Sequence, residues 1–159
     1  MIYREFENVL SIDECTFLKS AFGTEIGKID SSKMNPIQLK ICEDLNNKIG
    51  LFVSDKSKIE PWTFESVAPG QNTRLADPAK GLDKKDRFQT VILFLTKTKR
   101  GGNIKFREGT QIVPEIGKLL ILNNKTALDF KNDERSDFRF RSLNRGQNIV
   151  FITHVKYPN

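Results

Sequence analysis

The hydrophobic period of the chain changes near Pro61, and this change limits the folds that the sequence can adopt. Before Pro61, apolar residues recur every three or four positions, which is the spacing of an amphipathic helix. After it, short runs rich in Val, Ile, Phe and Thr are separated by Gly, Pro, Asn and Asp, as strands are by turns. Helices followed by strands indicate an α+β layout.

Two helices are predicted before the change of period. Residues 12–22 follow Ser11, and Glu14 stands three positions after that serine, as in a capping box. Residues 36–49 follow Asn35, a preferred N-cap residue. In the first helix the apolar residues at helical spacing are Ile12, Cys15, Leu18 and Phe22. In the second, the residues predicted to form a buried stripe are Ile37, Ile41, Leu45 and Ile49.

Six β-type runs follow. They are "WTFESV", "RFQTVILFLT", "NIKFR", "KLLILN", "DFRFR" and "NIVFITHV". Several short strands with turn residues and no helix between them favour a sandwich or a jelly-roll barrel. We therefore expect a single domain over residues 1–159, with residues 1–60 as helical support and residues 61–157 as the barrel.

Composition places the chain among ordinary globular proteins, with 38% hydrophobic and 29% charged residues. No run of 18 apolar residues predicts a transmembrane helix, and the N-terminus lacks the layout of a signal peptide. A cytoplasmic protein without a membrane partner is expected. Cys15 and Cys42 have no metal-site or redox spacing, so we expect buried free thiols.

The order of landmarks after Phe64 is more specific. The chain reads "FESVAPGQNTRLAD", "RFQTVILFLT", "RGGNIKF", "IVPEIGKLLILNN" and "SDFRFRSLNRGQNIVFITHV". Over roughly residues 62–157 it resembles the prolyl 4-hydroxylase-like branch of the Fe(II)/2-oxoglutarate dioxygenases. The resemblance implies a double-stranded β-helix, which is a cupin-like jelly roll, with two supporting N-terminal helices. Minimal copies of this fold are frequent in bacteriophages, so a viral source, in the virion or host cytoplasm, is one expectation.

Members of that family hold iron with a His-x-Asp pair and a distal His, and bind 2-oxoglutarate with a Lys or Arg. The resemblance places the metal ligands at Leu75, Asp77 and Phe138, the cosubstrate base at Asn148 after Gly146 and Gln147, and a cosubstrate-binding Tyr at Val67. A triad of two His and one carboxylate is needed for this kind of iron site. The chain contains one His, His154, which stands in the last strand, where the family places no ligand.

The strand period supports loss of the metal site. In "DFRFRS", Phe138 and Phe140 share one face, whereas Arg139 and Arg141 share the other. If the apolar face points into the barrel, Phe138 and Leu75 fill the space that iron would occupy. Burying each such side chain is worth about 1.5–3 kcal/mol. We interpret the site as dismantled, and we predict no metal, no cofactor and no catalytic residue.

Basic residues raise the question of an anionic partner, because the net charge is +6 and the sequence pI is about 9.4. The two basic clusters consist of Lys97, Lys99 and Arg100, and of Arg139, Arg141 and Arg145. If both clusters lie at one end of the barrel, they form one surface. The alternative is an ordinary charged outer face that prevents edge-to-edge pairing of strands.

Three functions are left open by these observations. The leading hypothesis is a catalytically inactive, dioxygenase-like domain that binds a protein partner or serves in assembly. The second is a nucleic-acid-binding module that uses the basic face. The third is an enzyme with non-standard chemistry in the old pocket. Plugging by Leu75 and Phe138 favours the first two, and an open polar cavity around Asp77 favours the third.

Overall fold

The computed structural model describes residues 3–69, 87–98, 100–106, 109–124, 138–140 and 143–157. Its helices are α1 (Ile12–Phe22) and α2 (Pro36–Ile49), with the 3-10 turns η1 (Ser31–Lys33) and η2 (Lys56–Lys58). Its strands are β1 (Tyr3–Phe6), β2 (Gly27–Ile29), β3 (Thr63–Val67), β4 (Arg87–Phe94), β5 (Arg100–Gly101), β6 (Ile104–Phe106), β7 (Gln111–Ile112), β8 (Leu119–Asn123), β9 (Phe138–Phe140), β10 (Leu143–Arg145) and β11 (Asn148–Lys156).

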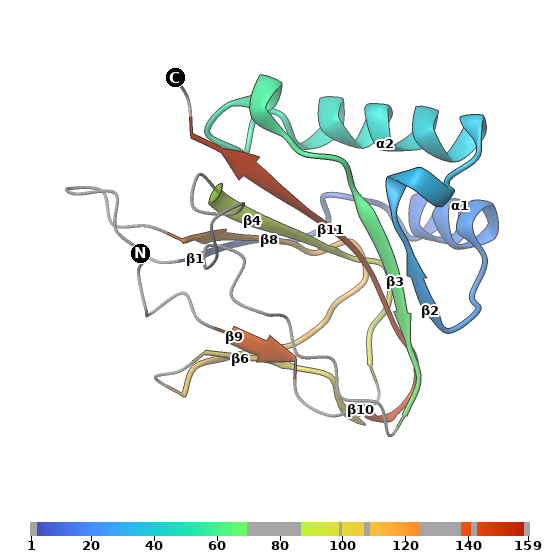
Figure 1. The fold of residues 1–159 in the computed structure, drawn as a ribbon. Helices are drawn as coiled ribbons and strands as arrows, with labels where there is room; N and C mark the ends of the chain where they lie inside the picture. The colour runs from blue at the N-terminus through green and yellow to red at the C-terminus, as the bar shows by residue number, and fades with distance from the viewer. Residues whose placement is uncertain are drawn as a thin grey trace.

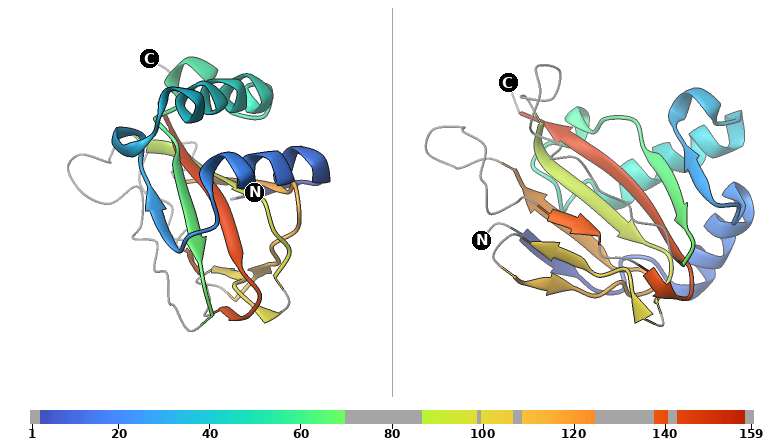
Figure 2. Two further views of the ribbon diagram at one scale, coloured as in Figure 1. Left: turned by 90° about the vertical axis from the view of Figure 1, so that its right-hand side faces the viewer. Right: turned by 60° about the horizontal axis from the view of Figure 1, so that its bottom comes forward.

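Three layers build the molecule. A six-stranded antiparallel sheet has the order β1-β8-β4-β11-β3-β2, and α1 and α2 cover one of its faces (Figure 1). The opposite face looks toward a smaller layer that contains the sheet β7-β6-β9 and the ladder β10-β5 (Figure 2). Two packed antiparallel layers with helices on one outer face agree with the predicted α+β jelly roll.

Both predicted helices are confirmed with their bounds, and local capping explains why they begin where they do. The Ser11 hydroxyl accepts the backbone N–H of Glu14 at 3.0 Å, and the Glu14 carboxylate accepts the N–H of Ser11 at 3.0 Å. Asn35 and Gln38 form the same reciprocal pair at the start of α2. Such boxes satisfy two N–H groups that no helical carbonyl can reach.

The predicted burial of Ile37 is wrong, and Ile12 in the apolar repeat of the first helix is exposed as well. Ile37 is 70% exposed and Ile12 is 68% exposed, whereas the other six residues of the two repeats are buried. An α-helix turns by about 100° per residue, so steps of three or four residues drift away from a straight stripe. Ile12 and Ile37 lie in the first turns, at about 90° from the centre of the buried stripe of each helix. The sheet therefore does not cover them.

The description of residues 1–60 as helical support is incomplete. β1 and β2 come from this part of the chain, and they form the two edges of the six-stranded sheet. β1 pairs with β8 and β2 pairs with β3, both antiparallel. Strands of four and three residues are too short to show a clear period in the sequence. All six predicted β-type runs do contain a strand.

Two apolar cores follow from this layering. The first lies between the helices and the six-stranded sheet, and it includes Trp62, Phe64 and Phe151. Cys15 and Cys42 are buried free thiols in this core, as predicted. The second core lies between the two strand layers and is described with the site below. In the part of the chain that the structure describes, no helix is both long and apolar enough to cross a membrane.

Gly117 holds the chain that leads into α1 against the loop that leads into β8. Its φ is +79°, and its carbonyl oxygen accepts the backbone N–H groups of Val9 at 2.9 Å and Leu10 at 3.3 Å. A Cβ atom at this position would lie 2.1 Å from the carbonyl oxygen of Leu10. Only glycine fits such a close approach of two backbones.

Candidate functional site

The residues at the two predicted cosubstrate positions lie beside each other. Val67, at the end of β3, is directly opposite Asn148, at the start of β11. Alternate residues of β11 belong to different cores: Phe151 packs under the helices, and Val150 packs between the two strand layers. Because side chains alternate along a strand, Val67 and Asn148 share the inter-layer face with Val150.

Asn148 is 3% exposed, and its side-chain oxygen Oδ1 has no hydrogen-bond partner among the described residues. Gln147, the other residue at the predicted anchor, is engaged elsewhere. Its side-chain Nε2 donates to the Ser66 hydroxyl at 2.8 Å and to the Thr24 carbonyl at 2.8 Å. Gln147 therefore ties the loop after α1 to β3, and the Asn148 side chain lies on the inter-layer face.

Glu65 is a site residue that sequence reasoning missed. It is 4% exposed and lies opposite Val150, so it shares the inter-layer face with Asn148. Diagonal neighbours in such a ladder are about 7–8 Å apart. The ammonium of Lys28 lies 3.4 Å from the Glu65 carboxylate, while the Lys28 side chain itself is 65% exposed. The alternation of side chains along "FESV" places Glu65 and Val67 on one face, and this alternation is the sequence signal that could have identified Glu65.

The space between the strand layers is filled by apolar side chains. The buried members of this inter-layer cluster are Ile92, Phe94, Ile104, Phe106, Ile112, Leu120, Leu122, Val150 and Ile152. Tyr3 stacks on Phe106 with ring centroids 5.0 Å apart. The cluster joins strands from both layers, so it is the core of the barrel.

The backbone ladder of the smaller layer places position 138 opposite Phe106 and position 140 opposite Ile104. Arg139 is opposite Lys105, which is half-buried. Phe106 and Ile104 belong to the inter-layer cluster, and directly opposed residues share a face. The register thus agrees with the predicted alternation along β9. Filling of the predicted iron position by the Phe138 ring stays a prediction, and Leu75 and Asp77 lie outside the described residues.

His154 lies far along β11 from Asn148. They are six positions apart, which corresponds to about 20 Å along a strand. The Nδ1 atom of His154 is 3.1 Å from the Thr90 hydroxyl, which also accepts the side-chain N–H of Asn124 at 2.8 Å. Within the described ranges, no group of three or more His, Cys, Asp or Glu side chains is placed to bind a metal ion.

One residue from each of the two predicted basic clusters is paired in the backbone ladder of the smaller layer. β5 pairs with β10, and in this ladder Arg100 is opposite Arg145. Arg139 belongs to the neighbouring β9-β6-β7 sheet of the smaller layer. Lys97 follows β4 and is exposed. The predicted members Lys99 and Arg141 fall outside the residues that the structure describes.

No protein-family model and no curated protein matches this sequence. Among solved structures, a viral collagen prolyl hydroxylase from Paramecium Bursaria Chlorella virus-1, in complex with 2OG, is similar over 100% of this chain and 97% of its own, with a TM-score of 0.78 and 19% identity. A prolyl-4-hydroxylase from Pseudomonas putida has a TM-score of 0.57 and 15% identity over 99% of this chain and 94% of its own. An oxidoreductase of the 2OG-Fe(II) oxygenase family from Burkholderia pseudomallei has a TM-score of 0.66 and 9% identity over 99% of this chain and 86% of its own.

At these identities the likeness concerns the fold alone. The chain has the double-stranded β-helix of the prolyl 4-hydroxylase-like 2OG-Fe(II) oxygenases, as its sequence landmarks implied. A shared fold does not establish a shared activity, which depends on the residues at the site.

Proposed function

We propose that this protein is a catalytically inactive, dioxygenase-like barrel that serves as a protein-binding or assembly component. The observation that carries the proposal is the single His of the chain. A facial triad for iron needs two imidazoles and one carboxylate. No alignment register supplies the second imidazole, and His154 is hydrogen-bonded to Thr90 about 20 Å along β11 from the predicted cosubstrate anchor.

The charge at the cosubstrate position supports the same proposal. A dicarboxylate such as 2-oxoglutarate needs a Lys or Arg to pair with its distal carboxylate. This chain offers Asn148, whose neutral amide forms no ion pair with a carboxylate. The buried carboxylate of Glu65 on the same face is paired with the ammonium of Lys28 at 3.4 Å. The predicted anchor therefore lacks the positive charge that would fit 2-oxoglutarate.

The apolar filling of the barrel is the third support. Each of the nine buried residues of the inter-layer cluster is 5% exposed or less. Such a core stabilises the fold without a metal, because each buried aliphatic or aromatic side chain contributes about 1.5–3 kcal/mol. A barrel maintained by packing leaves its outer surfaces to carry the function.

Calorimetric titration of the anaerobic protein with Fe(II) and 2-oxoglutarate tests the proposal. We expect no stoichiometric site of micromolar or tighter affinity. The double variant Leu75→His/Phe138→His serves as the positive control, because it supplies imidazoles at the two predicted His positions of a triad with Asp77, and it should bind Ni(II) or Fe(II). The variant Leu75→His/Arg139→His is matched to it but places one imidazole on the other face of β9, and it should not bind. A micromolar site in the unmodified protein refutes the proposal.

The pairing of Arg100 with Arg145 favours a second candidate function, in which the basic residues of the smaller layer bind nucleic acid. Phosphate binding by Lys and Arg weakens steeply as salt increases, because counterions are released. Fluorescence anisotropy with labelled single- and double-stranded 20-mers at 50 and 200 mM salt measures this. Arg100→Ala/Arg145→Ala should weaken binding about tenfold, and the control Lys33→Ala/Lys56→Ala should change it less than about twofold. Equal effects of both pairs would exclude a localised basic site.

A further inference from the structure

We infer that the end of the barrel around Glu65 and Asn148 is a binding site for a guanidinium group. The inference goes beyond the proposed inactive barrel, and it rests on the mismatch between these residues and 2-oxoglutarate. Glu65 on β3 is 4% exposed, and Asn148 on β11 is 3% exposed. The two strands are neighbours in the six-stranded sheet (Figure 1), and their register places both side chains on the inter-layer face.

The Asn148 amide is buried with its acceptor unsatisfied. Its side-chain oxygen Oδ1 has no hydrogen-bond partner among the residues that the structure describes. An unpaired buried acceptor costs free energy, so nearly all such groups in folded proteins are hydrogen-bonded. Val67, directly opposite Asn148, offers only an apolar side chain on this face. The position therefore requires a donor that the described part of the chain does not supply.

Glu65 adds a second acceptor with spare capacity. The Lys28 ammonium lies 3.4 Å from Oε1 of Glu65, whereas charge-assisted N–H···O bonds are about 2.7–2.9 Å long. An ionised carboxylate can accept about four hydrogen bonds. The ion pair with Lys28 balances the charge of Glu65, but it leaves most of this capacity unused among the described residues. Hydrogen-bonding capacity, and not net charge, therefore identifies the ligand.

Two acceptors on one face are complementary to a group that only donates hydrogen bonds. Ammonium and guanidinium groups carry N–H donors and no acceptor, whereas amides and hydroxyls carry both. The guanidinium is the better fit, because its planar fork of N–H donors can reach acceptors on two neighbouring strands. It is also more weakly hydrated than an ammonium, so it loses less hydration on entering a buried site.

Lys28 marks the route from solvent to this site. It lies on the edge strand β2, directly opposite Glu65, and its side chain is 65% exposed while that of Glu65 is 5% exposed. A side chain that extends from water to a buried carboxylate follows the path that a ligand would use. An exposed Lys gains little from an ion pair, so its ammonium can return to water when a guanidinium replaces it.

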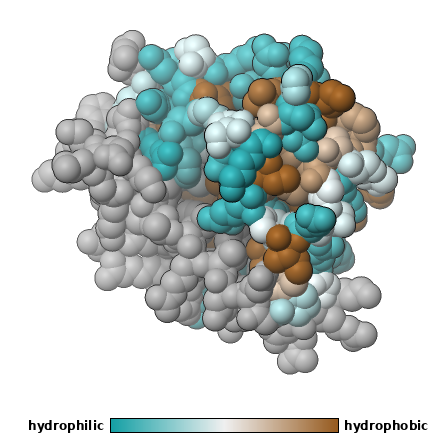
Figure 3. Space-filling view, turned by 45° about the vertical axis from the view of Figure 1, so that its right-hand side comes forward, coloured by the Kyte–Doolittle hydropathy of each residue, from teal (hydrophilic) through white to brown (hydrophobic). Residues whose placement is uncertain are grey.

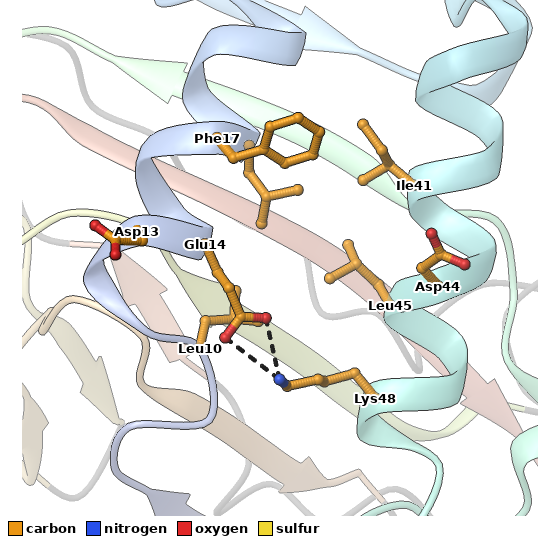
Figure 4. Close-up of a pocket in the computed structure, with 9 residues that line it drawn as sticks. Leu10, Asp13, Glu14, Phe17, Ile41, Asp44, Leu45 and Lys48 are labelled. Carbon is orange, nitrogen blue, oxygen red and sulfur yellow. Dashed lines mark hydrogen bonds and ion pairs between the residues drawn. The ribbon is translucent and has the colours of Figure 1, made fainter.

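The groove between α1 and α2 shows the opposite arrangement. It has a volume of about 400 Å³ and lies on the helix-covered side of the molecule, where apolar surface alternates with hydrophilic side chains (Figure 3). Two of its carboxylates, Glu14 and Asp44, are paired with Lys48 at 3.0 Å (Figure 4) and with Lys40 at 3.5 Å. Both pairs are exposed, so water satisfies their remaining hydrogen bonds. A buried and unsatisfied acceptor distinguishes the Glu65–Asn148 end of the barrel from this groove.

The test is an NMR titration of the isotope-labelled protein with methylguanidinium at constant ionic strength. We expect a Kd on the order of 1 mM for so small a ligand, with the largest shifts at the Asn148 side-chain amide. Methylammonium carries the same charge and should bind at least about fivefold more weakly. N-acetyl-arginine methylamide presents the guanidinium as an arginine side chain. Binding of both guanidinium probes assigns the site to an arginine of a protein, and binding of methylguanidinium alone assigns it to a small molecule.

Matched variants locate the site. Glu65→Gln should raise the Kd for methylguanidinium at least about tenfold, whereas Glu43→Gln, whose side chain is 71% exposed on α2, should change it less than about twofold. Asn148→Asp should lower the Kd at least about threefold, because a carboxylate of the same shape replaces the amide. Lys28→Met should also lower the Kd, because it removes the cation that the ligand displaces, and the exposed Lys33→Met is its control.

Circular dichroism confirms that each variant is folded. If Asn148→Asp does not fold, Asn148→Ala takes its place and should raise the Kd at least about threefold. Absence of saturable binding, equal binding of methylammonium, or equal effects of a variant and its control would refute the site. These results are separate from the iron titration. A micromolar iron site refutes the inactive barrel and leaves the methylguanidinium data unchanged, and failure of the guanidinium site leaves the iron result unchanged.

Discussion

Replacement of Phe138 by Ala should reduce the free energy of unfolding by about 3–5 kcal/mol, if its ring fills the former iron site. The backbone register supports this expectation, because position 138 is opposite Phe106, which is 1% exposed in the inter-layer cluster. Arg139→Ala, one residue away and on the other face, should change the same free energy by no more than about 0.5 kcal/mol.

The register also predicts an energetic coupling. Phe138 and Phe106 should interact as a cross-strand aromatic pair, which contributes about 0.5–1 kcal/mol beyond the separate losses. A double-mutant cycle with Phe106→Ala measures this term. The cycle of Arg139→Ala with Phe106→Ala should give a coupling energy near zero. Phe138→Leu is the milder substitution if the Ala variant does not fold, with an expected loss of about 1 kcal/mol.

Urea denaturation followed by the fluorescence of Trp62 is a suitable assay, because this Trp is the only one in the chain and is 1% exposed. With an m-value of about 2 kcal/mol/M, a loss of 4 kcal/mol moves the midpoint by about 2 M. A harmless Phe138→Ala together with a severe Arg139→Ala would show that the faces of β9 are inverted. The plugged-site reasoning would then fail.

Two further predictions concern the first core and the loop at Gly117. Gly117→Ala should cost more than about 3 kcal/mol in thermal or urea unfolding, because its Cβ would meet a backbone carbonyl oxygen at 2.1 Å; Gly23→Ala, with φ +82° and no atom within 4 Å, should cost only about 1 kcal/mol. Equal losses would show that positive φ, and not the contact, decides both. Burial raises the pKa of the Cys42 thiol from its ordinary value near 9 to about 11. Above pH 9 the unfolded chain therefore loses this proton first, so stability is complete below pH 9 and falls between pH 9 and 11, at a limiting slope of about 1.4 kcal/mol per pH unit. The slope should be smaller in Cys42→Ala, and an unchanged slope would contradict the assignment to this thiol.

The helices could be predicted because their signals are local. Ser11 with Glu14, and Asn35 with the turn that follows it, are contacts between residues three positions apart, so the sequence displays them directly. The long strands were likewise visible as runs of β-type residues. The short edge strands β1 and β2 were not, because a segment of three or four residues becomes a strand only when a neighbouring strand offers it hydrogen-bond partners.

The candidate site divides in the same way. The identity of the residues at the predicted metal and cosubstrate positions, and the presence of one His, are properties of the sequence alone. The burial of Glu65 on the inter-layer face near Asn148 depends on the pairing of β3 with β11, which are about eighty residues apart in the chain.

The groove between α1 and α2, whose lining includes Phe17, Ile41 and Leu45, depends on where the sheet holds the two helices. The sequence predicts each helix but not their relative position. Periodicity alone placed Ile12 and Ile37 in the apolar repeats of the two helices, although both are exposed. The spacing of the helices, the exposed ring of Phe17 and the bridge from Glu14 to Lys48 are long-range results of packing. Local chemistry thus determined which segments became helices and strands. The burial of Glu65 between the strand layers and the exposure of Phe17 between the helices were decided only in the tertiary structure, because residues distant in the chain supply the contacts.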